Sequence, residues 1–350
     1  MKKRLMIWLL ACTLTLGLLP EARAAVSYAD VPENHWASAD VARATELGLF
    51  QGVGGGNFGL GRPISRAAFA TALTRLFGWE EVRPSQPSYT DVSPDSWYYA
   101  AVETVLANGA VAASSHTFRP NEELTRGEMA SMLVRGLGYA SLAGSTDGFS
   151  VPFIDVTVNR GFITVAYDLG IMSGTGTNRF EPDAFATREQ AAAVLVRVHD
   201  QLTAASNQLT AAGEYRLITI STPIAQDGDE MPITPLEPLP ELYATLRRMK
   251  YNEDDMSKTA LRLMAGGVRT ITDAGGTPVA GSELISAKEV QKVLEGKDTT
   301  VFYSDRYESA YCIYSPNAYQ TATVWYQSDE SMAAKLQLAR LFGVTNYVLE

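Results

Sequence analysis

Three arginines recur directly after a serine or threonine that could cap a helix: Ser65-Arg66, Thr125-Arg126 and Thr187-Arg188. The hydroxyl of such a residue accepts a hydrogen bond from the first helical turn, where the helix dipole disfavours a cation. Free N–H groups at a helix start and an adjacent guanidinium can together bind a carboxylate or a phosphate. The pattern therefore predicts an anion site in three copies. A solvated arginine, or one paired with an aspartate at the edge of the core, would explain it equally well.

The residues around each arginine repeat with nearly constant spacing. A phenylalanine precedes each arginine by eight residues, at Phe58, Phe118 and Phe180, and a glycine precedes it by 17 or 18, at Gly48, Gly109 and Gly170. An Asp-Val pair begins each copy, at Asp30, Asp91 and Asp155. The first two copies also carry a tryptophan, at Trp36 and Trp97. The third copy lacks this aromatic residue and has 15 residues between aspartate and glycine, where the others have 18.

Each copy predicts two helices. The first is short and amphipathic and ends at the glycine, where a left-handed residue is favoured. The second begins at the cap, and Thr125 with Glu128, like Thr187 with Gln190, fits a capping box. The aspartate is expected to bind backbone N–H groups in its own turn. Because such units bury their apolar faces against one another, the sequence predicts one array of three repeats, residues 27–82, 88–142 and 150–202.

The N-terminus predicts export. Lys2, Lys3 and Arg4 precede an apolar run at 5–19, and Ala22 and Ala24 supply small residues at cleavage spacing. Residues 1–24 are therefore expected to be a signal peptide, since the run is shorter than the about 20 residues that a membrane span needs. A lipoprotein signal with a lipidated Cys12 is the minority alternative. Cleavage would leave Cys312 without an intramolecular disulfide partner.

Composition excludes several classes of function. Loss of the leader would change the formal net charge from −10 to −13, which makes nucleic acid an unlikely partner. The histidines are scattered, and the acidic clusters at 227–230 and 253–255 are typical of solvated loops rather than of calcium sites. The sequence therefore predicts no metal site, no cofactor and no membrane span after cleavage of the leader.

The periodicity ends near residue 200. Residues 203–240 predict a strand, at 215–221, and a proline-rich acidic connector. Residues 241–350 alternate predicted helices, near 239–250, 286–295 and 331–342, with short strands. The expected fold class is therefore multidomain: an all-α array followed by a smaller α+β, or partial α/β, module.

The repeated residues resemble the S-layer homology (SLH) domain in three tandem copies. This resemblance implies an all-α pseudo-threefold trimer of repeats that anchors the protein non-covalently to a bacterial cell wall. The implied ligand is a pyruvylated, peptidoglycan-linked secondary cell wall polysaccharide. It implies a secreted protein of the cell wall, cell surface or S-layer. By resemblance, the ligand-binding residues are the arginines Arg66, Arg126 and Arg188, their caps Ser65, Thr125 and Thr187, the aromatic residues Trp36 and Trp97, and the glycines Gly48, Gly109 and Gly170.

The copies depart from the family pattern to different degrees. Copy one reads Ser-Arg-Ala-Ala from Ser65 and has a glycine-rich loop, and copy three lacks the tryptophan. Copy two is the most complete, so Arg126 is expected to contribute most to binding. Because Arg126 lies against the helix dipole while Arg135 lies near the helix C-terminus, Arg126→Ala is expected to weaken binding with little loss of stability, and Arg135→Ala to cost stability.

The end of the chain is similar to the closing βα units of chitinase-like family 18 glycoside hydrolases, over about 60 residues. The resemblance rests on Val324-Trp325-Tyr326, the run from Ser331 to Ala339, and Phe342-Gly343-Val344. The family's Asp-x-x-Asp-x-Asp-x-Glu motif, whose glutamate acts as the catalytic acid, does not occur in the sequence. The expectation is a non-catalytic module. The alternatives are a wall-anchored glycoside hydrolase or carbohydrate-binding protein, and a structural subunit of a surface layer.

Overall fold

The computed structural model describes residues 27–350 except 147–148, 204–205, 212, 221–236 and 306, in two compact units that divide after Gln201. The predicted signal peptide and the acidic cluster at 227–230 lie outside the described residues. Within the part that is described, no helix has the length and apolarity needed to cross a membrane.

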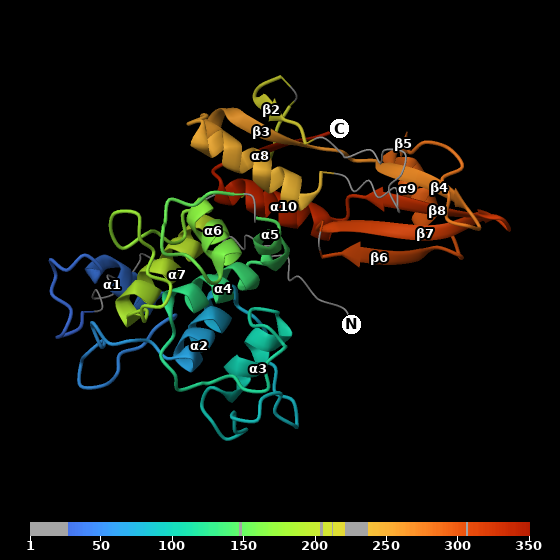
Figure 1. The fold of residues 1–350 in the computed structure, drawn as a ribbon. Coiled ribbons are helices and arrows are strands. Elements are labelled where there is room, and N and C mark those ends of the chain that lie inside the picture. The colour runs from blue at the N-terminus through green and yellow to red at the C-terminus, as the bar shows by residue number, and fades with distance from the viewer. Residues whose placement is uncertain (1–26, 147–148, 204–205, 212, 221–236, 306) are drawn as a thin grey trace, which may run out of the picture. The chain divides into compact units, whose positions relative to one another are not determined.

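The first unit is helical, as the repeats predicted (Figure 1). Its helices are α1 (Ser38–Glu46), α2 (Arg66–Phe77), α3 (Tyr99–Ala107), α4 (Arg126–Gly136), α5 (Ala140–Gly144), α6 (Arg160–Asp168) and α7 (Arg188–Thr203). Each repeat supplies a short helix followed by a longer one, and α5 is an additional turn of helix between repeats 2 and 3. A Cβ on Gly161 would overlap the carbonyl oxygen of Ala143, so the missing side chain allows α6 to lie directly against α5.

The predicted helix ends are confirmed. Gly48, Gly109 and Gly170 have φ of 70°, 72° and 70°, the left-handed conformation that terminates α1, α3 and α6. At the starts of α2, α4 and α7, the hydroxyls of Ser65, Thr125 and Thr187 accept hydrogen bonds from the N–H three residues later, at 3.3, 3.2 and 3.4 Å. Thr125 and Glu128 form the complete capping box. The local sequence thus sets where these helices begin and end.

The aspartate of each repeat has longer-range partners than its sequence context predicted. Its carboxylate does not bind only its own turn but accepts hydrogen bonds from the loop after the repeated phenylalanine position. Asp155 accepts from Phe180 N and Glu181 N, both at 2.9 Å. Asp91 accepts from Phe118 N at 2.8 Å and Arg119 N at 2.7 Å. Asp30 makes the equivalent contacts in repeat 1. Each aspartate therefore ties the start of its repeat to the loop that precedes the second helix.

These contacts predict loss of stability in acid. The N–H of Phe180 lowers the pKa of Asp155 below its ordinary value of 3.8. At Asp30, three backbone N–H groups outweigh desolvation and also lower the pKa. A depressed carboxyl pKa stabilises the folded state above the unfolded pKa of about 3.9, and this contribution is lost as pH falls through the folded value. We expect the melting temperature, measured by circular dichroism, to decrease when the pH is lowered below about 4. Asp155→Asn should flatten that fall, and the exposed control Asp95→Asn should not.

The repeats close on one another through backbone hydrogen bonds just before the second helices. Ile64 N donates to Ala186 O at 2.9 Å, Ala186 N to Leu124 O at 2.8 Å, and Leu124 N to Ile64 O at 2.9 Å. One residue from each repeat is thus both donor and acceptor in a closed ring. All three side chains are buried. The ring brings the N-termini of α2, α4 and α7, which carry the repeated arginines, to adjacent positions around one centre.

The second unit is an α+β module with two sheets (Figure 1). A parallel sheet has the order β1-β9-β3-β2, from β1 (Gln208–Leu209), β2 (Arg216–Ile218), β3 (Thr259–Leu263) and β9 (Asn346–Leu349). An antiparallel sheet has the order β5-β4-β8-β7-β6, from β4 (Gly267–Asp273), β5 (Glu283–Ile285), β6 (Thr300–Ser304), β7 (Ser309–Asn317) and β8 (Gln320–Tyr326). The helices are α8 (Leu239–Tyr251), α9 (Ala287–Leu294) and α10 (Asp329–Leu341), with a short 3-10 turn at Met256–Lys258.

A buried polar cluster joins the segments of this unit. Lys335 on α10 is fully buried, and its Nζ donates to Gln327 Oε1 at 2.9 Å and to Ser309 Oγ at 3.2 Å. Gln327 in turn donates to the carboxylate of Glu237, which precedes α8, at 2.5 Å. Burial lowers the pKa of Lys335 to about 7 and raises that of Glu237. A buried cation with these partners links α8, α10 and the antiparallel sheet.

Candidate ligand-binding interfaces

Each repeated arginine reaches across to the next repeat, and the order is cyclic. Arg66 Nε donates to Phe118 O at 2.8 Å, Arg126 Nε to Phe180 O at 2.9 Å, and Arg188 Nε to Phe58 O at 2.9 Å. Each guanidinium also lies over the ring of the same phenylalanine, with its carbon 5.1, 4.8 and 5.0 Å from the ring centre. The eight-residue spacing of phenylalanine and arginine therefore serves contacts between repeats. The partner of each arginine belongs to a different copy of the motif.

The terminal nitrogens distinguish the three interfaces. Arg126 Nη2 donates to Ser173 O at 2.8 Å, and Arg188 Nη2 donates to the equivalent carbonyl, Gln51 O, at 2.9 Å. Arg66 instead pairs with a carboxylate, since its Nη1 lies 2.9 Å from Glu128 Oε1. Two interfaces thus hold the guanidinium with neutral carbonyl groups, and one neutralises it.

The arginines are neither freely solvated nor paired with a core-edge aspartate. Arg126 is 7% exposed, and Arg66 and Arg188 are partly buried. Desolvation lowers the pKa of all three guanidinium groups, although arginine remains charged in proteins. A buried cation of this kind requires the hydrogen bonds that the neighbouring repeat supplies. The observed contacts of the three arginines therefore hold one repeat against the next.

The predicted aromatic residues lie at the surface. Trp36 is 61% exposed and Trp97 is 68% exposed, whereas most aromatic side chains of the unit are buried. Trp36 lines a cavity of about 360 Å³ together with Tyr28 and His35. The glycines Gly48, Gly109 and Gly170 lie at the ends of the first helices, so their conformation is explained without a ligand. Large exposed aromatic rings are available for stacking, and helix termination accounts for the glycines.

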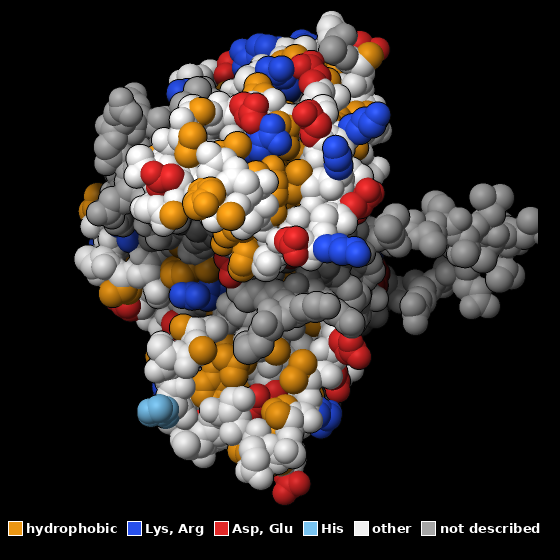
Figure 2. Space-filling view, turned by 90° about the vertical axis from the view of Figure 1, so that its right-hand side faces the viewer, with side chains coloured by type: hydrophobic (Ala, Val, Ile, Leu, Met, Phe, Trp, Pro, Cys, Tyr) orange, Lys and Arg blue, Asp and Glu red, His pale blue; other side chains and the backbone are white. Residues whose placement is uncertain are grey.

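One residue of the interfaces was missed by sequence reasoning. Glu128 was identified only as a capping residue, yet its carboxylate also pairs with Arg66 and with Arg119, at 2.9 and 2.7 Å. A signal was present, because the equivalent positions of the other repeats hold Ala68 and Gln190. On the face drawn in Figure 2, acidic and basic side chains are interspersed. At the Arg66 interface, the pairing with Glu128 neutralises the guanidinium.

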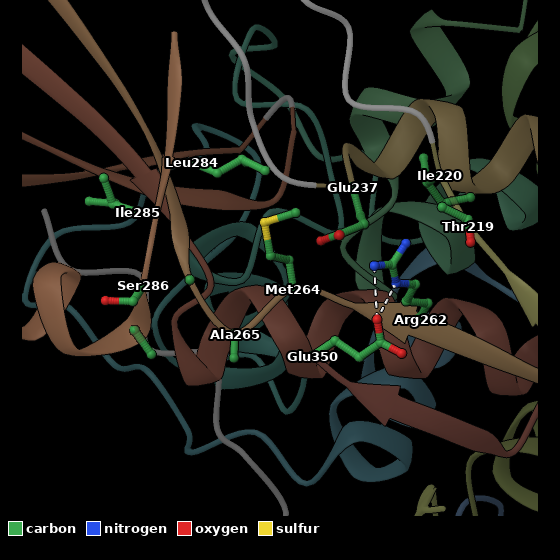
Figure 3. Close-up of a pocket in the computed structure, with 12 residues that line it drawn as sticks. Thr219, Ile220, Glu237, Arg262, Met264, Ala265, Leu284, Ile285, Ser286 and Glu350 are labelled. Atoms are coloured by element: carbon green, nitrogen blue, oxygen red, sulfur yellow. Dashed lines mark hydrogen bonds and ion pairs between the residues drawn. The ribbon is translucent and has the colours of Figure 1, made fainter. Parts of the chain in front are cut away.

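The second unit has a cavity of its own, of about 410 Å³. In Figure 3 the guanidinium of Arg262 and the carboxylate of Glu350 point toward one another, with an Nη2–Oε2 distance of 2.8 Å, and the side chain of Glu237 lies beside them. Met264, Leu284 and Ile285 add apolar lining. Among the described residues, no group of three acidic, histidine or cysteine side chains is arranged to hold a metal ion. Arg262 and Glu350 are thus paired with one another, while Glu237 accepts a hydrogen bond from Gln327.

Comparison with known proteins identifies the first unit. The profile of the S-layer homology domain matches residues 27–70, 88–130 and 159–192. An S-layer protein of Bacillus thuringiensis subsp. finitimus is 28% identical over 184 residues, which are 52% of this chain and 22% of that protein. An S-layer protein of Bacillus licheniformis is 32% identical over 178 residues, 49% of this chain and 20% of that protein. An endoglucanase of Bacillus sp. (strain KSM-635) is 27% identical over 219 residues, 59% of this chain and 23% of that protein.

The chain thus spans about a fifth to a quarter of the length of these curated relatives. Solved structures that it resembles include a putative sporulation-specific glycosylase from Bacillus subtilis, at 20% identity and a TM-score of 0.32 over 38% of this chain and 42% of that one. Another is the spore cortex-lytic enzyme of Bacillus cereus, at 13% identity and a TM-score of 0.31 over 66% and 60%. These scores are too low to assign an activity to the second unit. The sequence matches over the first unit do make an assignment: the chain carries three tandem S-layer homology domains and is a secreted protein of the cell surface.

Proposed function

We propose that the array of residues 27–202 anchors an exported protein non-covalently to the bacterial cell wall, by binding a secondary polysaccharide linked to peptidoglycan. The observation that carries this proposal is the set of three SLH domains in which every junction between repeats holds a conformationally fixed arginine. The exposed tryptophans of repeats 1 and 2 add surfaces on which a sugar ring can stack. More than one site on the same array would increase the overall affinity for a polymer with repeating acidic units.

The finer geometry of the array is part of the proposal. The closed ring of backbone hydrogen bonds through Ile64, Leu124 and Ala186, together with the cyclic contacts of Arg66, Arg126 and Arg188, supports a pseudo-threefold arrangement. In such an arrangement the three junctions are equivalent in backbone and differ in side chains. The proposed ligand group is a carboxylate, such as that of a pyruvyl acetal, because a guanidinium donates charge-assisted hydrogen bonds to it.

The proposed ligand-binding set is the one that the resemblance implied. The arginines would contact the acidic group and the capped helix N-termini would add partial positive charge. Trp36 and Trp97 would line the sugar. Gly48, Gly109 and Gly170 leave open space, since a Cβ on any of them would meet no atom within 3.4 Å. Close approach of a ligand to the backbone there is therefore sterically allowed.

We propose further that the second unit is displayed rather than catalytic. The support is the lack of an Asp-x-x-Asp-x-Asp-x-Glu motif in the sequence, without which family 18 chemistry has no acid to protonate the leaving oxygen. The endoglucanase among the relatives keeps a wall-anchored hydrolase as the alternative.

Sedimentation with purified cell walls tests the proposal. The mature chain should cosediment with native sacculi of an SLH-bearing Gram-positive bacterium and remain soluble with sacculi from which hydrofluoric acid has removed the secondary polymer. Equal binding to both preparations would identify peptidoglycan as the ligand and reject the polymer. Release of reducing sugar from the sacculi during the same incubation would support the hydrolase instead.

A further inference from the structure

The three repeat interfaces differ in one residue whose effect follows from the cyclic order. Each arginine contacts the repeat that follows it in the cyclic order. The third residue in the second helix of that following repeat therefore belongs to the same interface as the arginine. For Arg66 this residue is Glu128, in direct contact. The equivalent residue for Arg126 is Gln190, and for Arg188 it is Ala68. The series glutamate, glutamine, alanine therefore runs around the array.

Glu128 holds the position that an acidic ligand would take beside Arg66. Its Oε1 accepts from Arg66 Nη1 at 2.9 Å and from Arg119 Nη2 at 2.7 Å, and its Oε2 accepts from Thr125 N at 3.1 Å. Burial alone would raise the pKa of this carboxyl group, but the Thr125 N–H and the two arginines hold it below its usual range. Glu128 is therefore an anion at neutral pH. A carboxylate therefore already fills the space beside the Arg66 guanidinium.

The other two arginines keep their charge available. Among the described residues, neither Arg126 nor Arg188 forms an ion pair, and both are held by neutral carbonyl groups. Arg188 is the more accessible of the two, and Arg62 lies near enough to add positive potential. Asp30 and Glu189 carry negative charge near Arg188, but neither forms an ion pair with it. Asp30 accepts hydrogen bonds from Phe58 N, Gly59 N and Leu60 N, and Glu189 accepts one from Gly61 N at 3.0 Å.

The Arg188 interface also adjoins an aromatic surface. The ring of Tyr28 lies 5.4 Å from that of Phe58, over which Arg188 is placed. Tyr28 in turn lines the cavity of about 360 Å³ that Trp36 borders. A saccharide whose carboxylate reaches Arg188 would thus find aromatic side chains beside it.

We propose that Glu128 acts as an internal anion that closes the Arg66 interface to acidic saccharides, and that these ligands bind at the Arg126 and Arg188 interfaces, most strongly at Arg188. The proposal rests on the proposed wall-binding function. Its physical basis is that a second carboxylate placed beside Glu128 would meet like-charge repulsion. Motif completeness predicted the strongest binding at Arg126. That ranking is reversed, because Glu128, the glutamate that completes the motif of repeat 2, is also the residue that blocks Arg66 of repeat 1.

Two charge changes at the same helical position test this proposal in opposite directions. Ala68→Glu places a carboxylate beside Arg188, and Ala68→Gln is its neutral control of the same shape. Glu128→Gln removes the carboxylate beside Arg66. The cap should survive, since Gln190 already makes the reciprocal bond to Thr187 N at 3.2 Å in repeat 3. Glu122→Gln, at an exposed partner of Arg119, is the control with the same change in net charge.

The full mature chain is titrated against native sacculi and against sacculi stripped of polymer, at low and high ionic strength, with melting temperatures recorded for every variant. We expect Ala68→Glu to weaken binding about tenfold relative to Ala68→Gln, and Glu128→Gln to strengthen it about threefold or more relative to Glu122→Gln. Both differences should shrink in high salt.

Each result supports or overturns a definite statement. If Ala68→Glu binds as Ala68→Gln does, Arg188 does not carry the acidic group. If Glu128→Gln binds as Glu122→Gln does, or more weakly, Glu128 does not block the Arg66 interface. Failure of the unmodified chain to prefer native sacculi would instead reject the secondary polymer as its ligand, and with it the proposed function. The failures of the two proposals are thus distinguishable.

Discussion

Arg126→Ala should lower the free energy of unfolding of the SLH array by about 3 kcal/mol, because two carbonyl groups lose hydrogen bonds to a charged donor. The side chain is 7% exposed and serves Phe180 O and Ser173 O of the next repeat. Its removal also leaves a gap over the Phe180 ring. Urea denaturation of the mature chain, followed by far-ultraviolet circular dichroism, measures the loss.

The matched control is Arg43→Ala, since Arg43 is an exposed arginine whose ion pair among the described residues is with Glu46 on the same helix, at 3.6 Å. It should change stability by less than about 0.5 kcal/mol. An Arg126→Ala variant as stable as Arg43→Ala would show that contacts across the repeat interface contribute little. Arg135→Ala should fall between them, at about 1 kcal/mol, because Arg135 lies 4.6 Å from the centre of the Phe162 ring. This ranking is the reverse of that expected from helix dipoles alone.

Lys335→Ala should destabilise the second unit by about 4 kcal/mol, the effect of removing one partner from a buried charged network. Lys335 is fully buried, and its loss leaves Gln327 and Ser309 without a donor and removes the cation that acts most strongly on Glu237. Calorimetry of the mature chain is done at pH 6, below the lowered pKa of Lys335 of about 7. It should show a lower transition temperature for this unit and an unchanged transition temperature for the SLH array.

Two variants separate a lost charge from a lost side chain. Lys292→Ala, on the exposed face of α9, should lie within about 0.5 kcal/mol of the unmodified chain. The double variant Glu237→Gln/Lys335→Met should recover much of the stability that Lys335→Ala loses, since the buried charge of Glu237 is removed together with that of Lys335. A double variant as unstable as Lys335→Ala would attribute the effect to packing around α10.

The second unit was predictable only in outline. The expected helix at 239–250 matches α8, and the strand expected at 215–221 contains β2. The sequence did not indicate that β1 and β2 lie at opposite edges of a parallel sheet, beside β9 and β3. Strand order depends on contacts between segments far apart in the chain, which short periodic patterns do not encode. For the same reason, the sequence did not predict that Ser309 and Gln327 accept hydrogen bonds from Lys335.

What the sequence determined by itself in the first unit is local. The spacing of Gly48, Gly109 and Gly170 and of the caps Ser65, Thr125 and Thr187 defined the helix ends, because left-handed termination and side-chain capping involve residues within one turn. The threefold recurrence of these signals also determined that the region is one array, since a two-helix unit cannot bury its apolar face alone.

Only the tertiary structure decided what the arginines contact. The motif treats Arg66, Arg126 and Arg188 as equivalent, and a reading of each copy in isolation would assign Glu128 to Thr125 alone. Cyclic closure sets Glu128 beside Arg66, while the other two guanidinium groups meet carbonyl oxygens. The charge available at each interface is therefore a property of two neighbouring repeats. It depends on which copy follows which around the ring, because an ion pair requires atoms within about 4 Å whatever their separation in sequence.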